Sequence, residues 1–339
     1  MTDRSKNALS LGLSLGLGGV LLWLALRNAD LAAVGAALAD GAWGWMVPFV
    51  AVGVLSVVVR AWRWGLLIDA LPGRQRPVPL RLTTASVAIG YLVNYAAPRV
   101  GEVARAANVS RRAPAPFSAV IGTVVAERVL DVVALALALL SVLALYGDRV
   151  GAILAQAGDT ARGLAEATPA WAVAVAVVAL VGLGALAVVV VRRGRGRIAG
   201  VVGHFRDGFV SVARTGRPGA VVGSTLLLWL CYGLMSDLPL RLLGLDAAYG
   251  LGPVDAWAVM AVGGIGMALP APGGTGSFHY ATVQALTLLF GVAVTPAATY
   301  AILVHAAGVV FYCVLGVAAL GLQGTSLGAI RQQAEAVDA

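Results

Sequence analysis

Long apolar runs recur along the whole sequence, and short polar stretches separate them. A helix needs about 20 apolar residues to cross roughly 30 Å of hydrocarbon, and six runs reach about that length. They lie near residues 8–26, 43–60, 117–146, 170–191, 220–238 and 296–322. The pattern predicts an all-α, polytopic membrane helix bundle with about six full spans.

Two further stretches, 83–98 and 255–290, are apolar but interrupted by proline, glycine and charged residues. Broken backbone at membrane depth is tolerated only where protein or water surrounds it. We expect two re-entrant helical hairpins, over 83–110 and 255–290, each entering and leaving by one face of the membrane. Opposed broken hairpins are typical of transporters whose substrate site lies at the bilayer midplane.

The distribution of arginine indicates which loops face the cytoplasm. The loop at 192–219 carries seven arginines. The loop between the second span and residue 82 carries Arg60, Arg63, Arg74, Arg76 and Arg81. Both loops reach the cytoplasmic side only if 83–110 returns without crossing. The same rule predicts that both termini are cytoplasmic. Arginine accounts for 23 of the 24 basic residues, and alanine, glycine and valine are abundant, which is typical of a GC-rich bacterial genome, so we expect a bacterial inner membrane.

The apolar segments continue almost to the end of the chain. We therefore expect a single transmembrane domain over 1–325 and a short cytoplasmic tail over 326–339. The first apolar run follows Arg4 and Lys6, but it is too long for a signal peptide and has no cleavage pattern before Arg27. We interpret this run as a retained membrane anchor.

Composition supports the membrane class. Hydrophobic residues make up 60% of the chain and charged residues 12%, whereas soluble domains carry about 25% charged residues. The net charge of +8 does not indicate nucleic-acid binding, because the arginines lie in short loops beside the spans. Cys231 and Cys313 lie inside predicted spans, which gives neither a disulfide framework nor a metal-ligand spacing. We expect no cofactor and no metal.

Charged residues follow the predicted turn of the first hairpin, in the sequence Asn-Tyr-Ala-Ala-Pro-Arg-Val-Gly-Glu-Val-Ala-Arg from Asn94 to Arg105. Pro98 cannot continue a helix, so the chain turns there. Arg99, Glu102 and Arg105 are three residues apart and therefore face one side of the second arm. Charge inside an apolar segment is expensive and favours a functional role. A salt bridge that only anchors the hairpin is the structural alternative.

A second group of charges lies in the span 117–146, about ten residues past its start. At a rise of about 1.5 Å per residue, Glu127 and Asp131 lie near the bilayer midplane, and their spacing puts both on one helix face. Such carboxylates must be paired. We expect Arg99 or Arg105 to contact one of them, as a buried structural network, as a headgroup site that includes Arg128, or as both.

The second hairpin contains a glycine-rich turn, Pro-Ala-Pro-Gly-Gly-Thr-Gly-Ser-Phe-His over 270–279. Backbone N–H groups before a helix that starts near Ser277 would suit an anionic group. No lysine follows as in a Walker A loop, so ATP hydrolysis is not supported. The candidate residues are Gly273, Gly274, Gly276 and His279, and a plain tight turn is the structural alternative.

Three isolated features have simpler interpretations. His305, in the last span, is interpreted as a packed bundle residue, with a proton relay as the alternative. Asp237 is interpreted as a residue at a helix end. Gly12 and Gly16 fit a pattern of close helix packing.

Taken in order, three blocks of the sequence resemble the signature blocks of the lysylphosphatidylglycerol synthase transmembrane-region family, also called the flippase-like family. The blocks are Pro98-Arg99-Val100-Gly101-Glu102 with Arg105, Glu127-Arg128 with Asp131, and Pro272-Gly273-Gly274-Thr275-Gly276. The likeness covers nearly the whole chain. Each block alone is weak, but their order and spacing together are fairly specific.

The resemblance implies a membrane domain that moves a lipid, by analogy aminoacylated phosphatidylglycerol, between leaflets. Family members that also make the lipid carry a soluble aminoacyl-transfer domain after the membrane part, so a chain that ends at Ala339 is not expected to make it. The family tends to place a glutamate where this sequence has His279. That departure bears on whether the same cationic headgroup is handled.

We therefore expect a non-enzymatic protein that translocates a phospholipid or polyprenyl-linked lipid through a central polar cavity. Its partner would be a membrane lipid with an anionic or zwitterionic headgroup, not nucleic acid. The arginines would pair the lipid phosphate, and the midplane carboxylates would meet a cationic group or balance those arginines. The candidate lipid-binding residues are Asn94, Arg99, Glu102, Arg105, Glu127, Arg128, Asp131, Gly273, Gly274, Gly276 and His279.

Two rival hypotheses belong to other classes. One is a membrane-embedded transferase that uses a polyprenyl-phosphate sugar. Such enzymes usually need an acidic pair in an external loop, and Asp30 and Asp40 are too far apart to form one. The other is an accessory protein in glycan or lipid assembly that supports a separate synthase or glycosyltransferase.

Overall fold

The computed structural model describes residues 3–73, 76–96, 100–113, 115–167, 213–269, 271–326 and 328. These residues form helices and turns and include no β-strand, which confirms the all-α prediction. The helices are α1 (Asp3–Leu26), α2 (Leu31–Ala39), η1 (Trp43–Trp45), α3 (Met46–Asp69), α4 (Leu80–Ala96), α5 (Val100–Arg112), α6 (Phe117–Ala167), α9 (Pro218–Leu242), α10 (Leu245–Tyr249), α11 (Pro253–Ala268), η2 (Pro272–Gly274), α12 (Ser277–Gln284), the π-helix η3 (Ala285–Leu289) and α13 (Val294–Gln323).

Four helical segments are long and apolar enough to cross a membrane: Trp43–Asp69, Phe117–Gln156, Pro218–Leu242 and Val294–Gln323. They match four of the six predicted spans. The predicted span at 8–26 corresponds to α1, which bends by 80° into α2, and this pair adds a fifth candidate if it counts as one span. The predicted span at 170–191 lies outside the described residues. A total of six spans therefore stays a prediction.

The second span is longer than the sequence pattern predicted. We expected it to end near residue 60, with Arg60 and Arg63 in a cytoplasmic loop, but α3 continues to Asp69 and both arginines are buried inside it. That prediction was wrong, because both guanidinium groups are paired with carboxylates of α6 and so do not end the apolar helix.

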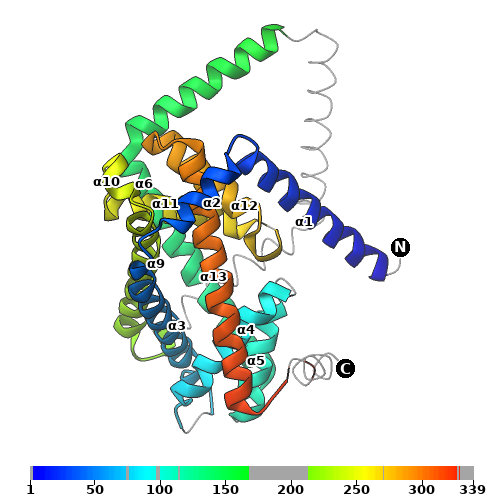
Figure 1. The fold of residues 1–339 in the computed structure, drawn as a ribbon. Helices are drawn as coiled ribbons and strands as arrows, with labels where there is room; N and C mark the ends of the chain where they lie inside the picture. The colour runs from blue at the N-terminus through cyan, green and yellow to red at the C-terminus, as the bar shows by residue number, and fades with distance from the viewer. Residues whose placement is uncertain are drawn as a thin grey trace.

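Two helical hairpins occur where the sequence is broken. The first consists of α4 and α5, which approach so closely that a methyl group added at Gly101 would overlap the carbonyl oxygen of Gly90. The second consists of α11 and α12, and α12 begins at Ser277 as predicted. Figure 1 shows the two hairpins toward opposite ends of the bundle. Whether they re-enter one membrane face stays a prediction.

The tips of the two hairpins meet beside the middle of α13. The ring of Tyr95, at the end of α4, lies 3.0 Å from the position of a methyl group added at Gly273 in η2. The Tyr95 hydroxyl also lies 3.9 Å from such a position at Gly308, near the centre of α13. Figure 1 shows α12 beside the first half of α13 and α4 beside its second half. The opposed arrangement therefore places both turns at the same depth.

Close packing of α1 against the second hairpin depends on Gly18. A methyl group at Gly18 would lie 2.9 Å from the Thr275 carbonyl oxygen, and one at Gly276 would overlap the Gly18 backbone. Among the described residues, methyl groups at Gly12 and Gly16 would meet nothing within 4 Å. The close contact of α1 that the structure describes is therefore made by Gly18, and packing through Gly12 and Gly16 stays a prediction.

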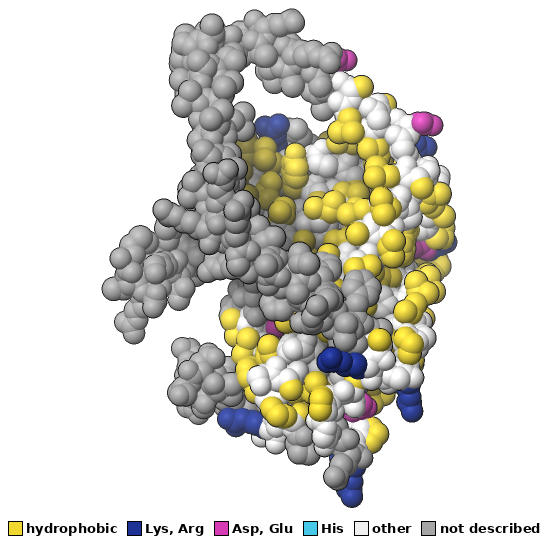
Figure 2. Space-filling model, turned by 180° about the vertical axis from the view of Figure 1, so that it is seen from behind, with side chains coloured by type: hydrophobic (Ala, Val, Ile, Leu, Met, Phe, Trp, Pro, Cys, Tyr) yellow, Lys and Arg dark blue, Asp and Glu magenta, His cyan; other side chains and the backbone are white. Residues whose placement is uncertain are grey.

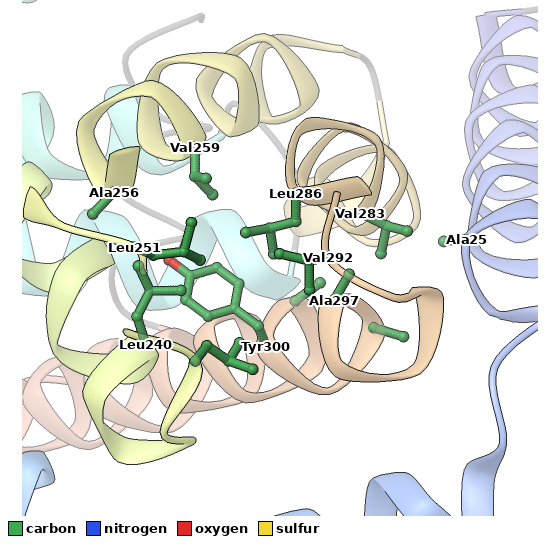
Figure 3. Packing of buried hydrophobic residues seen from close by; sticks show 13 residues of the cluster. Ala25, Leu240, Leu251, Ala256, Val259, Val283, Leu286, Val292, Ala297 and Tyr300 are labelled. Atoms are coloured by element: carbon green, nitrogen blue, oxygen red, sulfur yellow. The ribbon is translucent and has the colours of Figure 1, made fainter. Parts of the chain in front are cut away.

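A buried apolar cluster holds the second hairpin to α9 and α13. Figure 3 shows the Tyr300 ring among side chains such as Leu240, Leu251 and Leu286. The Tyr300 hydroxyl donates to the Ser236 carbonyl oxygen at 2.7 Å, so this buried polar group is satisfied. The outer surface is also apolar. Figure 2 shows the molecule from behind, with hydrophobic side chains over much of the described part of this face, as expected for contact with lipid.

Single-cysteine labelling tests the membrane topology. In a background with Cys231 and Cys313 replaced by alanine, cysteines at Gln75, Pro116 and Gly200 should react only with reagent added from the cytoplasmic side. Pro116 is chosen because it is exposed, whereas Ala113 nearby is buried. Ala248→Cys is the external control. External labelling at 116 would mean that the first hairpin crosses the membrane fully.

A pair of glycine variants tests the packing of α1. Gly18→Ala should destabilise the protein by about 1–3 kcal/mol, because the added methyl group overpacks a backbone contact. Gly16→Ala is the matched control and should be neutral or slightly stabilising, since alanine is the better helix former. Thermal unfolding in detergent measures both. A Gly18→Ala protein as stable as Gly16→Ala would show that α1 does not pack on the loop.

Candidate functional site

The structure brings seven charged side chains together where α3, α5 and α6 meet. We call this group the charge cluster, and it consists of Arg60, Arg63, Glu102, Arg105, Glu127, Arg128 and Asp131. Helical spacing explains how each helix contributes: residues three or four apart share one face, as Arg60 and Arg63 do on α3 and Glu127 and Asp131 do on α6. The cluster therefore forms only when α3, α5 and α6 are aligned so that these faces lie at the same level.

Glu127 lies at the centre of the cluster and is fully buried. Its Oε1 atom lies 2.7 Å from Arg60 Nε and 3.4 Å from Arg63 Nη2, and its Oε2 atom accepts a hydrogen bond from Arg105 Nη1 at 2.8 Å. The predicted contact between a hairpin arginine and a midplane carboxylate is confirmed for Arg105. Arg99 lies outside the described residues.

Asp131 receives a second set of contacts from α3. Its Oδ1 atom accepts from Arg63 Nη2 at 2.6 Å, and its Oδ2 atom accepts from Arg60 Nη2 at 2.7 Å. Both arginines of α3 thus bridge Glu127 and Asp131. Each oxygen of the two carboxylates has an arginine partner, so these carboxylates balance the arginines, one of the two roles that we predicted.

The outer side of the cluster is partly exposed. Arg128 contacts Glu102 of α5 and lies 3.9 Å from Asp131. The Arg128 side chain is 47% exposed, whereas that of Arg63 is 0% exposed. The Glu102–Arg128 pair therefore forms the rim of an otherwise buried site.

Aromatic and hydroxyl side chains fix the orientation of the arginines. Arg60 Nη1 donates to the Tyr91 hydroxyl at 3.2 Å and to the Tyr232 hydroxyl at 3.1 Å. The Arg105 guanidinium lies 4.6 Å from the Trp64 ring centroid, a cation–π distance. These neutral partners hold the guanidinium groups in place without cancelling their charge.

Positive charge exceeds negative charge in the cluster, since four guanidinium groups face three carboxylates. Within the described part of the chain, Arg63 Nε and Arg105 Nη2 are buried and have no hydrogen-bond partner. A buried donor left unpaired costs about 1–3 kcal/mol. An anion that accepts from these groups would satisfy both the charge and the donors.

Asn94 makes a structural contact that we did not predict, and its contact with lipid stays a prediction. Its Oδ1 atom accepts a hydrogen bond from the Gly101 N–H at 2.8 Å, which closes the α4–α5 hairpin. No described contact joins Asn94 to the charged side chains. Asn94 therefore positions the arm that carries Glu102 and Arg105.

The glycine-rich loop, residues 271–276, is separate from the charge cluster, and no described polar contact joins the two. Gly273, Gly274 and Gly276 have φ values of 58°, 74° and 85°, which favour glycine. We predicted free N–H groups for an anion, but three of them donate within the protein: Gly274 to Ala271, Thr275 to Pro272, and Gly276 to His279. For these three N–H groups the prediction was wrong, because acceptors within the protein already bind them.

A hollow of about 490 Å³ lies elsewhere, lined by Ala42, Trp43, Gly44, Trp45 and Pro48. Trp45 is fifteen residues before Arg60 on the same helical segment, or roughly 22 Å at the helical rise. This hollow is not the predicted central polar cavity, which stays a prediction.

Arg60 and Arg63 are the site residues that our sequence reasoning missed. They stand three apart in an uninterrupted apolar run, Val-Val-Val-Arg-Ala-Trp-Arg-Trp. Two arginines on one face of a span are expensive unless carboxylates meet them, and Glu127 and Asp131 are such a pair. Pairing the two arginines with these two carboxylates would have placed Arg60 and Arg63 in the site.

The comparison with known families agrees with this arrangement of blocks. Residues 8–316 match the family described as "Lysylphosphatidylglycerol synthase TM region". The chain belongs to this family. It is thus a multi-pass membrane protein of the lysylphosphatidylglycerol synthase transmembrane-region family, which is associated with lipid handling, and the match includes the whole charge cluster. No curated protein and no solved structure matches the chain.

Charge-changing variants test whether the cluster acts as a unit. Glu127→Ala should cost about 3–5 kcal/mol and give the lowest yield, because it leaves three buried arginines facing Asp131 alone. Arg105→Ala should cost less, since two arginines then face two carboxylates. The double variant should lie between them. Thermal unfolding and membrane yield measure the order, and exposed Arg111→Ala, on the same helix, is the control. Additive losses would show that Arg105 and Glu127 do not interact.

Proposed function

We propose that this protein binds the headgroup of a phosphate-containing lipid at the charge cluster and moves that lipid between the leaflets of a bacterial inner membrane. The observation that carries the proposal is the unbalanced positive charge, with unpartnered donors on Arg63 and Arg105. Phosphate is the anionic group that every membrane phospholipid offers at the depth of its headgroup.

Guanidinium chemistry supports phosphate as the ligand. Arginine presents a planar set of N–H donors that matches phosphate oxygens two at a time. Arg105 already uses Nη1 for Glu127, and its Nη2 remains for a second acceptor. A headgroup that also carries an amine has a partner in Glu102, whose Oε2 atom has no described hydrogen-bond partner.

Depth supports translocation over binding at the membrane surface. Glu127 lies ten residues after Phe117, the first residue of α6. With the span beginning at residue 117, as the sequence predicts, ten residues correspond to about 15 Å, half of the hydrocarbon thickness. The apolar segment Phe117–Gln156 is longer than one crossing needs, so this depth rests on the predicted start of the span. A headgroup held at that depth is equally far from the two membrane surfaces. A site that only recognises lipids at one surface does not need such a depth.

The Glu102–Arg128 rim offers the route by which a headgroup reaches the buried arginines. Arg128 is half exposed and contacts α5 through Glu102 alone among the described ion pairs. A lipid phosphate that replaces Glu102 on Arg128 breaks one of the two described ion-pair links between α5 and α6, and the other, Arg105–Glu127, is weakened when Arg105 also binds the phosphate. We infer that the α4–α5 hairpin moves during transport, with both termini of the chain in the cytoplasm.

The proposal contains no chemical step by this chain, and a separate synthase or glycosyltransferase would make its lipid. The transferase alternative predicts a new covalent product when the protein is given a polyprenyl-phosphate sugar. The accessory alternative predicts that the protein alone moves no lipid. Both outcomes are separable in reconstituted vesicles.

Arg105→Lys tests the phosphate site while keeping the charge count. Lysine retains the positive charge but loses the forked donor geometry, so movement of fluorescent phospholipid in proteoliposomes and phospholipid co-purification should fall roughly tenfold, equivalent to about 1.4 kcal/mol. Arg112→Lys, on the same helix but exposed, is the matched control and should behave as the wild type.

Three results bear against the proposal. Wild-type protein that neither retains nor moves a phospholipid contradicts it directly. Equal activity of Arg105→Lys and Arg112→Lys would separate lipid movement from the charge cluster. Lipid movement that disappears in both variants would indicate a general loss of fold instead of a local site.

A further inference from the structure

Two histidine rings from different helices lie next to each other beside the glycine-rich loop, tilted by 55°. The rings of His279 in α12 and His305 in α13 have centroids 4.7 Å apart. His279 is buried, with 6% of its surface exposed. Phe278 packs against both rings, with centroid distances of 6.1 and 5.8 Å. We call these two side chains the histidine pair.

The hydrogen bond of His279 requires a neutral ring. The Gly276 N–H donates to His279 Nδ1 at 3.4 Å. A backbone N–H can only donate, so Nδ1 must carry no proton. Protonation of His279 would place two donors against each other and break this contact.

His305 contacts the same loop through a group that tolerates either state. The Thr275 hydroxyl lies 3.4 Å from His305 Nε2, and a hydroxyl can donate or accept. A proton on His305 therefore reverses that bond without breaking it. The two histidines respond differently to acid, and only His279 loses its link to the loop.

The surroundings of the pair contain no described carboxylate. His305 is the titratable side chain that acts on His279, and Tyr95 of α4 lies beside the loop. Tyr280 follows His279 in α12. Asp255, the acidic residue of α11, lies at the far end of that helix and accepts hydrogen bonds from the Tyr146 hydroxyl and the Gly252 N–H. The described side chains of α1, from residue 14 to 26, and those of η3 include no titratable group.

We propose that His279 and His305 form a site that binds one proton and thereby controls the contact of the glycine-rich loop with α1 and α4. A second proton would put two like charges 4.7 Å apart and is disfavoured. Acid releases Gly276 from His279 and loosens the loop.

The loop is placed so that its release reaches the first hairpin. Gly276 packs on Gly18 of α1, and Gly273 packs on Tyr95 at the tip of α4. The residue before Tyr95, Asn94, holds Gly101, which precedes Glu102 of the charge cluster. Acid therefore speeds lipid movement by freeing the α4–α5 hairpin. This last step rests on the proposed function, whereas proton binding and loop release do not.

Two isosteric variants test the proposal. Asparagine at 279 can place its oxygen near the Nδ1 position, and glutamine at 305 can place a polar atom near Nε2; neither titrates. We would measure the full-length wild type, His279→Asn and His305→Gln in vesicles between about pH 3 and 8, a range that extends well below the ordinary histidine pKa because burial opposes a charged ring. His204→Asn, at the third histidine of the chain, is the control.

Three readouts are needed. Hydrogen exchange at the histidine ring carbon, followed by mass spectrometry, reports proton binding. Backbone amide exchange of a peptide covering 271–277, compared with His279→Asn at each pH, reports loop release. Movement of fluorescent phospholipid reports the functional effect. We expect wild type and His204→Asn to take up one proton at the pair, loosen the loop and gain roughly fivefold in rate on acidification, the change expected from losing one hydrogen bond. His279→Asn should give flat profiles of loop exchange and of lipid movement.

The outcomes separate this proposal from the proposed function. Histidines that stay neutral across the range, or loop exchange that is the same in wild type and His279→Asn, overturn the proton site whether or not lipid moves. Proton uptake and loop release without lipid movement at any pH would support the site and reject the proposed function. A pH profile of lipid movement that is equally steep in His279→Asn overturns the control of transport by the pair.

Discussion

The buried carboxylate of Glu127 is the constraint on which the rest of the bundle depends. It has no solvent exposure, so its charge must be met by cations from the protein. Arg60 and Arg63 reach it from α3, and Arg105 reaches it from α5. Lipid-embedded helices gain little from hydrophobic attraction to one another, because lipid tails are equally apolar. Polar contacts of this kind therefore fix the register of three helices.

The two hairpins share an architecture but carry different chemistry. The first brings Glu102 and Arg105 to α6, and the second brings an uncharged turn and His279 to α13. Their tips meet at Tyr95 and Gly273, beside the middle of α13. A displacement of one tip would therefore change the packing of the other. The charged hairpin thus packs against the loop that contains the Gly276–His279 hydrogen bond. That bond requires an unprotonated Nδ1 on His279.

Sequence patterns predicted the elements well where local rules decide them. Apolar run length located four spans, and proline and glycine located both hairpins, including the start of α12 at Ser277. The pairing of Arg105 with Glu127 followed from the cost of a midplane charge. Arg60 and Arg63 were instead predicted to end a span and to lie in a loop, so no buried carboxylate partners were predicted for them. Packing partners could not be predicted either: nothing in the local sequence distinguishes Gly18, which packs against Thr275, from Gly16, beside which no described atom lies within 4 Å of an added methyl group.

The charge count of the cluster also bears on which lipid it fits. The described side chains leave one positive charge unbalanced, and a phosphodiester headgroup carries one negative charge, so the occupied cluster would be neutral. A terminal phosphomonoester carries about −1.5 to −2 at neutral pH and would leave a negative excess. Excess charge of either sign is costly at low dielectric. Under the proposed function, the described cluster would therefore favour a diester-linked phospholipid over a polyprenyl monophosphate, and binding that lipid would remove the unbalanced charge of the empty site.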